Sequence, residues 1–466
     1  MAERTLETDY LVVGAGAAAM AFADTLLEDS DASMTIVDRR HKPGGHWLDA
    51  YPFVRLHGPS ANYGVNSRPL GSGLIDRIGL NQGLYELATG PEICAYFDRV
   101  MHQRLLPSGR VTWLPLGDWQ DGVVTSRVNG ARTRVAVRRR VVDATFADTR
   151  VPATHPPGFA VAAGVQCVPP NELVRLREPC AGFVIVGAGK TAMDTAVWLL
   201  EQGADPDSIT WIRPRDAWLL NRRNVQPSHD FFDRTIGAFA DEMESARDAK
   251  SLDDLFAQLE EKGQLCRIDR SVWPTMYRCA IVSDAELEQM RRIRKVVRLG
   301  HVSAIEPGRI VLEHGTVPTS PDHVHVHCSA DGIPKRKPQP IFQEGKILLQ
   351  YVRRCSPTFS GALVAHLEAT LDDDATRNAM ATPVPIPDEP IDWLRNQLAD
   401  ARNSFAWRQS PELQRWLVES RLDTFSAMIA RAMREPTPAS SAILERWGRA
   451  IKPGVARLAE LLASAH

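Results

Sequence analysis

Two stretches of the chain share one pattern of apolar and polar positions. Each begins with four consecutive apolar or aromatic residues, continues through a glycine-rich turn and ends in a helix-forming run; the stretches span residues 10–27 and 183–200. A short apolar run bounded by glycine is typical of a buried strand, and the run after it has the length of a helix. The pattern predicts an α/β fold with two Rossmann-like dinucleotide-binding domains.

The first turn (GAGAAA) has small residues at the three positions that a bound diphosphate requires. Gly14 permits a tight turn, Gly16 lets the backbone approach a pyrophosphate, and Ala19 lets the helix pack on its strand. The free N–H groups and the dipole of the helix start would hold the diphosphate. The next strand ends at Asp38, about 20 residues further on, where a ribose-binding acid is expected. We therefore assign Asp38 and the adjacent Arg39 to the cofactor site.

A second glycine pair follows this acid, in the segment HKPGGHW that ends with Gly45, His46 and Trp47. The succession of Gly-x-Gly, a ribose acid and Gly-Gly-x-Trp resembles the FAD-binding half of flavoproteins with two dinucleotide domains. It is most similar to the NADPH-dependent flavin monooxygenases of the flavin-containing, Baeyer–Villiger and N-hydroxylating types. The resemblance implies FAD-binding roles for Gly14, Gly16, Asp38, Gly45 and Trp47, with His46 in the same segment.

The second turn (GAGKTA) has the same glycine spacing, but different residues follow it at the position that would contact the ribose. Gly187 and Gly189 take the two glycine positions, and Lys190 and Thr191 open the helix. The spacing lacks the four residues that precede Gly-Lys in a P-loop, so an ATP site is excluded. Where an NAD site would carry an acid, this chain has the arginines Arg213 and Arg215. Arginine pairs with a 2′-phosphate, so the second site is predicted to bind NADPH.

A long segment without periodicity, residues 48–67, lies between the two turns. Loops of this length inside a compact domain are usually functional, and this one is too apolar to be disordered. In the resembled family the equivalent segment reaches the flavin ring. The catalytic candidates are therefore Arg55, His57, Asn62 and Asn66. The alternative, that these side chains only tie the loop to its own backbone, stays open.

The rest of the chain divides around these motifs. We expect the first part of the FAD domain at residues 1–175, with an amphipathic helix at 86–106 and a β-meander at 110–147. The NAD(P)H domain is expected at 176–325, with a helical insertion at about 216–300 that would cap the flavin or form a dimer contact. The second part of the FAD domain is expected at 326–384, and a helical region at 385–466 would be a packed tail, a substrate lid or a dimer contact.

Three local features refine this division. The linker fingerprint of several Baeyer–Villiger enzymes is not matched, because Asp148 stands where its glycine should be. Alternating histidines at 323, 325 and 327 lie in a row without a fourth ligand, so we expect a packed or partly wetted strand face and no metal. The family fold implies that Asp331 lies at the return to the FAD domain. It also implies that Phe359 and Ser360 begin a helix aimed at the flavin.

Composition excludes other classes. Net charge is −2 and basic runs are short, so no nucleic-acid partner is expected. The polar N-terminus and the lack of a long apolar run predict no signal peptide and no membrane span, and we expect a cytoplasmic protein. The seven cysteines form no close pair, which argues against disulfides, a cysteine-ligated metal site and a redox dithiol.

The motifs predict FAD and NADPH as cofactors. The resemblance implies a monooxygenase that inserts one oxygen atom from O2 into a small-molecule substrate through a flavin C4a-(hydro)peroxide, and a homodimer is left open. The first alternative is an NAD(P)H-dependent flavin reductase or oxidase without oxygenation. The second is a non-enzymatic binding module with a flavoprotein fold. The sequence does not indicate the substrate.

Overall fold

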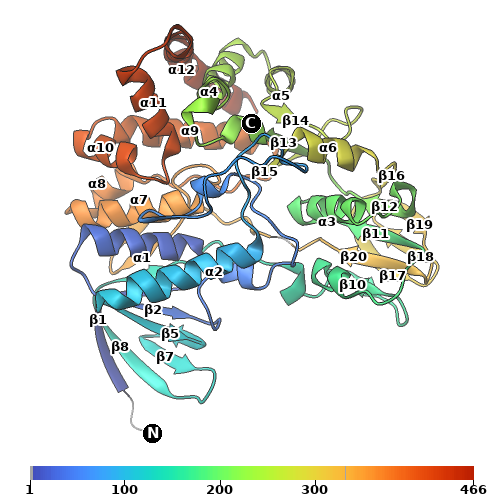
Figure 1. Ribbon diagram of the computed structural model, residues 1–466, viewed down its shortest axis with the longest axis horizontal. Helices are drawn as coiled ribbons and strands as arrows, with labels where there is room; N and C mark the ends of the chain where they lie inside the picture. Colours follow the sequence, from blue (N-terminus) through green and yellow to red (C-terminus); the bar gives the residue numbers. More distant parts are fainter. Residues whose placement is uncertain (1–3, 331, 466) are drawn as a thin grey trace.

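The computed structural model describes residues 4–330 and 332–465 of the 466-residue chain. Two α/β regions lie side by side beneath a layer of helices (Figure 1). Each α/β region is built on a parallel sheet that contains one of the two glycine turns, followed directly by a helix. The expected fold class, two Rossmann-like domains with a C-terminal helical region, is confirmed.

The first sheet has the strand order β21-β22-β8-β1-β2-β5, and its neighbours from β22 to β5 run parallel. Its strands are β1 (Arg4–Val13), β2 (Met34–Asp38), β5 (Val111–Pro115), β8 (Arg132–Asp143), β21 (Phe342–Gln343) and β22 (Lys346–Leu348). The helices beside it are α1 (Ala17–Asp29), α2 (Gly90–Val100) and α7 (Pro357–Thr370). Because β21, β22 and α7 follow the second sheet in the sequence, the chain returns to its first domain.

The expected meander at 110–147 is present in part. Strands β6 (Gly117–Gln120), β7 (Val123–Ser126) and β8 pair antiparallel in succession. Strand β8 also joins the parallel sheet, and β5 belongs to that sheet alone, on the other side of β1 and β2. Both strands are half exposed, so their alternation could not distinguish them from the strands of a meander.

The second sheet is parallel throughout, with the order β10-β20-β11-β12-β16. Its strands are β10 (Cys167–Val168), β20 (His323–His327), β11 (Gly182–Val186), β12 (Ile209–Ile212) and β16 (Lys295–Val297), and α3 (Lys190–Glu201) follows β11. The histidine row lies on β20, between β10 and β11. His325 is almost fully buried and its Nε2 lies 2.8 Å from the Thr319 hydroxyl, so this strand face is packed.

A smaller sheet, β19-β18-β17-β9, covers the linker side of the second domain. Its strands are β9 (Ala160–Val161), β17 (Val302–Glu306), β18 (Arg309–Leu312) and β19 (Gly315–Pro318). In the linker before it, Asp148 takes the place of the fingerprint glycine and adopts a φ of +42°. Asp tolerates this left-handed conformation better than most residues, which fits a turn at this position.

The insertion expected to be helical contains a sheet as well. Strands β13 (Ala217–Asn221), β14 (Leu265–Cys266) and β15 (Met276–Val282) pair in the order β14-β13-β15. The insertion helices are α4 (Phe232–Asp248), α5 (Leu252–Glu261) and α6 (Asp284–Arg291). The first of these strands, AWLLN, carries too few residues to display a period, and its residues Trp218 and Leu219 are fully buried.

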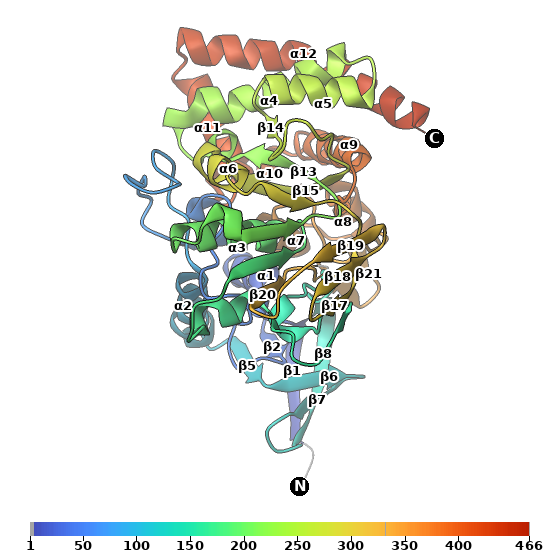
Figure 2. The ribbon, with the colours of Figure 1, turned by 90° about the vertical axis from the view of Figure 1, so that its right-hand side faces the viewer.

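The C-terminal region is helical, as expected, and packs on the insertion. Its helices are α8 (Asp374–Met380), α9 (Pro390–Trp407), α10 (Pro411–Glu419), α11 (Thr424–Arg434) and α12 (Pro438–Ser464). Figure 2 shows α12 lying along α4 at one end of the molecule. A Cβ on Gly454 of α12 would come within 2.6 Å of the Met243 carbonyl oxygen, so this glycine permits the close approach of the two helices. No helix among residues 4–330 and 332–465 is long and apolar enough to cross a bilayer.

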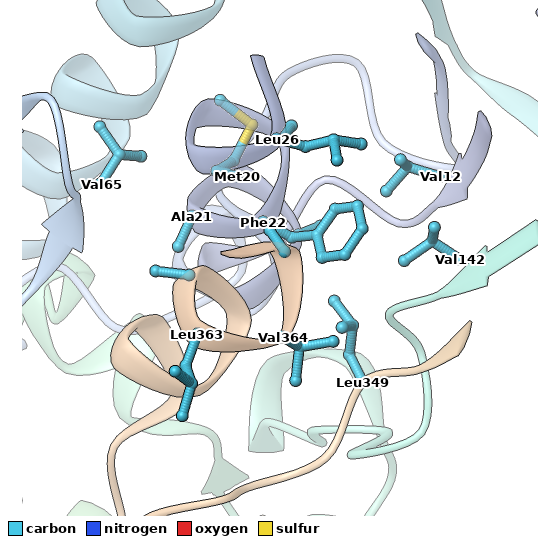
Figure 3. Packing of buried hydrophobic residues seen from close by; sticks show 14 of the residues in the cluster. Val12, Met20, Ala21, Phe22, Leu26, Val65, Val142, Leu349, Leu363 and Val364 are labelled. Carbon is cyan, nitrogen blue, oxygen red and sulfur yellow. The ribbon is translucent and has the colours of Figure 1, made fainter. Parts of the chain in front are cut away.

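The core of the first domain lies between α1, α7 and the parallel sheet. Phe22 of α1 lies against Val12, Val142 and Val364, and all four side chains are fully buried (Figure 3). Gly361 of α7 lies directly on the Ala18 carbonyl, so the two helices are in backbone contact. This packing fixes α1 and thereby the direction in which its first turn points.

One expectation about cysteine is wrong. Cys279 on β15 and Cys355, just before α7, form a disulfide with a Cα–Cα distance of 6.5 Å. The other five cysteines are free thiols. The two partners are 76 residues apart in the sequence, so local spacing contained no sign of the pair.

Candidate cofactor and active site

The first glycine turn is closed by a second backbone segment. Gly14 adopts a φ of +99°, and Gly16 begins α1 without a side-chain cap. The Gly44 N–H donates to the Ala15 carbonyl at 2.8 Å. A Cβ on Gly45, whose φ is +60°, would come within 2.9 Å of the Gly16 Cα. The Gly44–Gly45 pair therefore packs against the turn in a way that no larger residue would permit.

Asp38 holds this turn in place. Its carboxylate accepts hydrogen bonds from the Ala15 N–H at 2.6 Å and the Arg40 N–H at 2.7 Å, and the residue is only 7% exposed. The carboxylate thus already satisfies backbone donors at the turn, while the predicted neighbour Arg39 is exposed. A ribose role for Asp38 stays a prediction, since each oxygen retains a second acceptor position.

Trp47 connects the glycine pair to the long loop. Its indole N–H donates to the Tyr63 hydroxyl at 2.8 Å, and the two rings meet edge to face. The His46 ring lies 5.0 Å from the Trp47 ring. Burial, together with the charge of Arg40, lowers the pKa of His46 to about 4, so this imidazole is neutral near pH 7.

The second glycine turn is more open. Gly187 adopts a φ of +130°, and a Cβ there would come within 2.7 Å of the Cys328 carbonyl oxygen. The indole N–H of Trp211, on β12, donates to the Gly187 carbonyl at 2.8 Å and fixes the backbone of the turn. At Gly189, which begins α3 without a side-chain cap, an added Cβ would meet no atom within 4 Å. The helix start thus faces free space that a diphosphate could fill.

Lys190 and Asp194 form an ion pair along the first turn of α3. The other Asp194 oxygen accepts from the Tyr51 hydroxyl at 2.6 Å. Tyr51 belongs to the long loop of the first domain, and Thr191 lies in the same helix turn. Burial raises the pKa of the Tyr51 hydroxyl, so it stays protonated and donates to Asp194. The predicted phosphate lysine is therefore part of a contact between the two domains.

Arg213 is buried with unsatisfied donors. The residue is 2% exposed, its guanidinium lies 5.0 Å from the centre of the Trp211 ring, and one nitrogen lies 3.3 Å from Asp216. Among residues 4–330 and 332–465, its Nε and another terminal nitrogen find no hydrogen-bond partner. Burial lowers the pKa of Arg213 to about 10, which still leaves the guanidinium charged near pH 7. A buried cation with free N–H groups is suited to bind an anion.

Arg215, the second arginine of the pair, has a different environment. Its guanidinium binds the Asp388 carboxylate at 3.0 Å and donates to the Thr275 carbonyl at 2.6 Å. Asp388 also binds Arg278 and Lys335. The two arginines predicted to share one phosphate therefore have different partners, and Arg215 connects the insertion to the C-terminal region.

Of the four catalytic candidates, His57 is held by the backbone of β15 in the second domain. Its Nδ1 accepts from the Ile281 N–H at 3.1 Å, which leaves the proton on Nε2. Burial, followed by the charges of Lys190 and Arg222, lowers the pKa of His57 to about 3. Arg222 is fully buried and donates to the His57 carbonyl at 2.8 Å. His57 is thus a neutral imidazole in a fixed tautomer.

The two asparagines bind distant segments: Asn62 contacts both the insertion and the C-terminal region, and Asn66 contacts the C-terminal region. The Asn62 amide donates to the Val225 carbonyl at 3.1 Å, and its oxygen accepts from the Thr424 hydroxyl at 3.2 Å. The Asn66 oxygen accepts from the Ser420 hydroxyl at 2.9 Å. These contacts match the reading in which the side chains tie the loop down, although to distant segments and not to the loop's own backbone.

Arg421 lies at the centre of the same contact. Its guanidinium donates to the carbonyls of Ala61, Tyr63 and Val65 at distances from 2.6 to 3.1 Å. Burial lowers its pKa. Arg421 therefore holds the loop between β2 and α2 from the far end of the chain.

The remaining candidates are dispersed. Arg55 is exposed, and no hydrogen bond joins it to the other three catalytic candidates. Phe359 and Ser360 are each 1% exposed; the Arg353 guanidinium lies 3.7 Å from the centre of the Phe359 ring, and Ser360 donates to the Ser356 carbonyl at 2.7 Å. Both residues thus stabilise the start of α7 from within. Asp331 lies outside the described residues.

The chain has well-matched relatives of similar length. It is 48% identical over 433 residues to "Uncharacterized protein Rv2000" of Mycobacterium tuberculosis, a match that covers 93% of this chain and 80% of the relative. The same values hold for "Uncharacterized protein Mb2023" of Mycobacterium bovis. The chain belongs to the family of these mycobacterial proteins. The names of these relatives give no activity, so membership of this family does not by itself indicate which reaction the chain catalyses.

Two further comparisons describe the fold. Residues 12–67 match the family model of the NAD(P)-binding Rossmann-like domain. This range contains the first turn, Asp38, the Gly44–Gly45 pair and all four catalytic candidates. The polycyclic ketone monooxygenase of Thermothelomyces thermophila superposes with a TM-score of 0.51 at 14% identity, over 91% of this chain and 86% of that chain. The chain has the fold of the two-dinucleotide-domain flavin monooxygenases.

Several site residues had no signal in the sequence. Tyr51, Tyr63 and Asp194 lie within stretches that the motifs marked, but nothing in their spacing indicated a contact between domains. Arg421 lies between two helices of an amphipathic tail and looks like an ordinary surface arginine. Its role depends on the tail folding back onto the loop, which no local pattern predicts.

Proposed function

We propose that the chain is an FAD-dependent oxidoreductase that receives hydride from NADPH, and that it is a monooxygenase of small molecules. The observation that carries the proposal is the pair of unsatisfied Arg213 nitrogens beside an open, acid-free second turn. The first turn differs in carrying an acid and a second glycine pair, so the two sites favour different dinucleotides.

The residues fit a dinucleotide at each turn. Helices α2, α6, α9 and α12 begin with capping boxes. In contrast, α1 and α3 begin at glycine with no side-chain cap and no acid in the first turn. Their first N–H groups would be satisfied by a diphosphate. FAD would bind at Gly14, Gly16 and the Gly44–Gly45 pair, and NADPH at Gly187, Gly189 and Arg213.

Arg213 favours NADPH over NADH. A 2′-phosphate would supply the acceptors that its Nε and terminal nitrogen lack, and Trp211 would hold the guanidinium plane. A free ribose hydroxyl could satisfy only part of this charge. The Lys190 ammonium would then interact with both the diphosphate and Asp194. The hydrogen bond from the Tyr51 hydroxyl would keep the Asp194 carboxylate in place.

Bound FAD would supply hydride acceptance and oxygen activation, and the protein would supply position and exclusion of water. The overall balance is substrate, O2, NADPH and a proton giving oxygenated substrate, water and NADP⁺. Because its Nδ1 accepts from Ile281, His57 would present its Nε2–H as a neutral donor at the junction of the two domains. Arg421 would keep the loop closed against water through three backbone carbonyls.

The experiment separates oxygenation from simple oxidase activity. The FAD-loaded protein is reduced anaerobically with NADPH, mixed rapidly with oxygenated buffer and followed by absorbance, with hydrogen peroxide measured at the end. A transient absorption band that forms after mixing with oxygen and decays before the oxidised flavin spectrum returns supports a monooxygenase. The same conclusion requires less than one hydrogen peroxide per NADPH when thioanisole or cyclohexanone is present. Direct reoxidation with one peroxide per NADPH in every case would favour the reductase or oxidase alternative.

A further inference from the structure

The disulfide joins two segments that are far apart in the chain. Cys279 lies where β15 bulges against β13: Trp218 pairs with Tyr277 and Leu220 with Ile281, so three residues of β15 stand opposite Leu219 alone. Cys279 and Cys355 both adopt a φ of +54°, a conformation that L-residues rarely hold without support. The bridge is the covalent support that both positions share.

The two sulfurs differ in access. Cys279 is 3% exposed and packs beside the Tyr277 hydroxyl, whereas Cys355 is exposed. An attacking thiolate can therefore reach the bridge from the Cys355 side. Burial raises the pKa of three free thiols, Cys167 to about 11 and Cys266 and Cys328 to about 12, so these cysteines remain protonated and compete poorly in exchange.

The bridge lies two residues from a contact with the candidate site. Ile281, which follows the bulge, donates its N–H to His57 Nδ1. On the other side, Arg354 binds Glu242 of α4, and Arg353 binds Asp423 at the start of α11. The disulfide thus connects the strand that orients His57 to the segment that anchors the helical layer.

We propose that Cys279–Cys355 is a reversible thiol–disulfide exchange site for a dithiol reductant, and that the intact bridge holds the backbone donor that orients His57. The exchange chemistry is independent of the proposed function. Only its consequence for NADPH-dependent turnover rests on that function.

The chemistry is a two-step exchange. A thiolate of the reductant attacks Cys355 Sγ, forms a mixed disulfide and expels Cys279 as a thiolate, which takes up a proton. The second thiol of the reductant attacks the mixed disulfide, releases Cys355 as a thiol and leaves as a disulfide. Two electrons and two protons pass from the dithiol to the protein, and oxidation by a disulfide reverses both steps.

Loss of the bridge would act through the backbone. Without the cross-link, Cys279 and Cys355 can leave the left-handed region, and the bulge of β15 can relax. The Ile281 N–H would then separate from His57 Nδ1, and the imidazole would lose the partner that fixes its tautomer.

The first test counts thiols on the full-length protein under native conditions. Alkylation without reductant, followed by mass spectrometry of peptides, should leave both Cys279 and Cys355 unmodified. Alkylation of a denatured, unreduced sample serves as the control and should modify only the five free cysteines. Incubation with dithiothreitol before alkylation should add Cys355 and Cys279, and removal of the reductant with oxidised dithiothreitol should restore the bridge. Modification of all seven cysteines in the absence of reductant, or a pair that never reacts in the native protein, would overturn the proposal.

The second test follows hydrogen exchange in the peptide that contains Ile281. Reduction should speed exchange of this amide by about tenfold and leave β11, which belongs to a different sheet from β15, unchanged. Cys279→Ser and Cys355→Ser should exchange fast with or without dithiothreitol, and Cys180→Ser should respond like the wild type. Unchanged exchange at Ile281 after reduction contradicts the coupling to His57. Neither test needs FAD or NADPH, so their failure is distinct from failure of the proposed function.

Discussion

The two glycine turns are nearly identical in sequence but differ in how they are completed. At the first, Asp38 binds the turn's own Ala15 amide and Gly45 lies on Gly16. At the second, the space beside Gly189 is open and Arg213 has donors without partners. The first turn is therefore stabilised by the protein itself, whereas the second is left for a ligand to complete.

This difference separates two functions of the same motif. A turn closed by its own carboxylate contributes to folding even without cofactor. A turn with a buried, partly unsatisfied arginine costs stability until an anion binds. The comparison predicts that substitutions at the first site lower the stability of the unliganded protein. At the second site the packed Gly187 should behave in the same way, whereas substitutions at the open positions, Gly189 and Arg213, should instead change ligand binding.

The largest expected effect is that of Gly187→Ala. The new Cβ would meet the Cys328 carbonyl oxygen at 2.7 Å in a φ region that alanine disfavours, so the free energy of unfolding should fall by roughly 3–5 kcal/mol. Gly189→Ala is the matched control because its Cβ meets no atom. It should change stability by less than about 1 kcal/mol and weaken NADPH binding. Chemical denaturation and NADPH titration check the pair, and equal destabilisation would contradict the described turn.

Arg213→Gln should change coenzyme preference. Loss of charge-assisted hydrogen bonds to a phosphate, each about 1.5–3 kcal/mol, should raise the KM for NADPH roughly 10–100-fold and leave the KM for NADH nearly unchanged. The unliganded variant should be as stable as the wild type or more so, because a desolvated cation is removed. An equal rise in both KM values would refute the phosphate role.

Asp38→Asn tests the opposite property at the first turn. Asparagine can accept only one of the two backbone N–H groups, and its own amide would face the other. The unliganded protein should lose about 1–2 kcal/mol of stability in thermal or chemical denaturation. Full stability together with weaker FAD binding would assign Asp38 to the ribose alone.

The smallest effect is expected for Arg215→Gln. Arg215 is partly exposed and Asp388 keeps Arg278 and Lys335, so the cost should be below about 1 kcal/mol. The ratio of kcat/KM with NADPH to kcat/KM with NADH should not change. A shift in that ratio as large as the one expected for Arg213→Gln would show that Arg215 also binds the 2′-phosphate.

Sequence patterns predicted what depends on neighbours along the chain. Apolar runs and glycines located both turns and their helices, and the region after residue 385 was correctly predicted to be helical. The patterns did not predict the strands of the insertion. β14 has two residues and cannot display a period, and β13 (AWLLN) and β15 (MYRCAIV) do not alternate between apolar and polar residues.

What the sequence could not give depends on distant partners. The pairing of Arg215 depends on Asp388, which lies in the C-terminal region. The disulfide joins residues 76 positions apart, and the Asn62 and Asn66 contacts reach more than a hundred residues along the chain. No local propensity contains these pairings, so residue type identified candidates but not their roles.

The most direct test of the account compares hydride donors. The FAD-loaded protein is mixed anaerobically with NADPH or NADH, and loss of the flavin's visible absorption is timed for the wild type and for Arg213→Gln. The account predicts that NADPH reduces the wild type at coenzyme concentrations about 10–100-fold lower than NADH requires, and that the variant loses this advantage. Equal reduction of the wild type by both coenzymes, or failure of the protein to retain FAD, would contradict the assignment of the two turns.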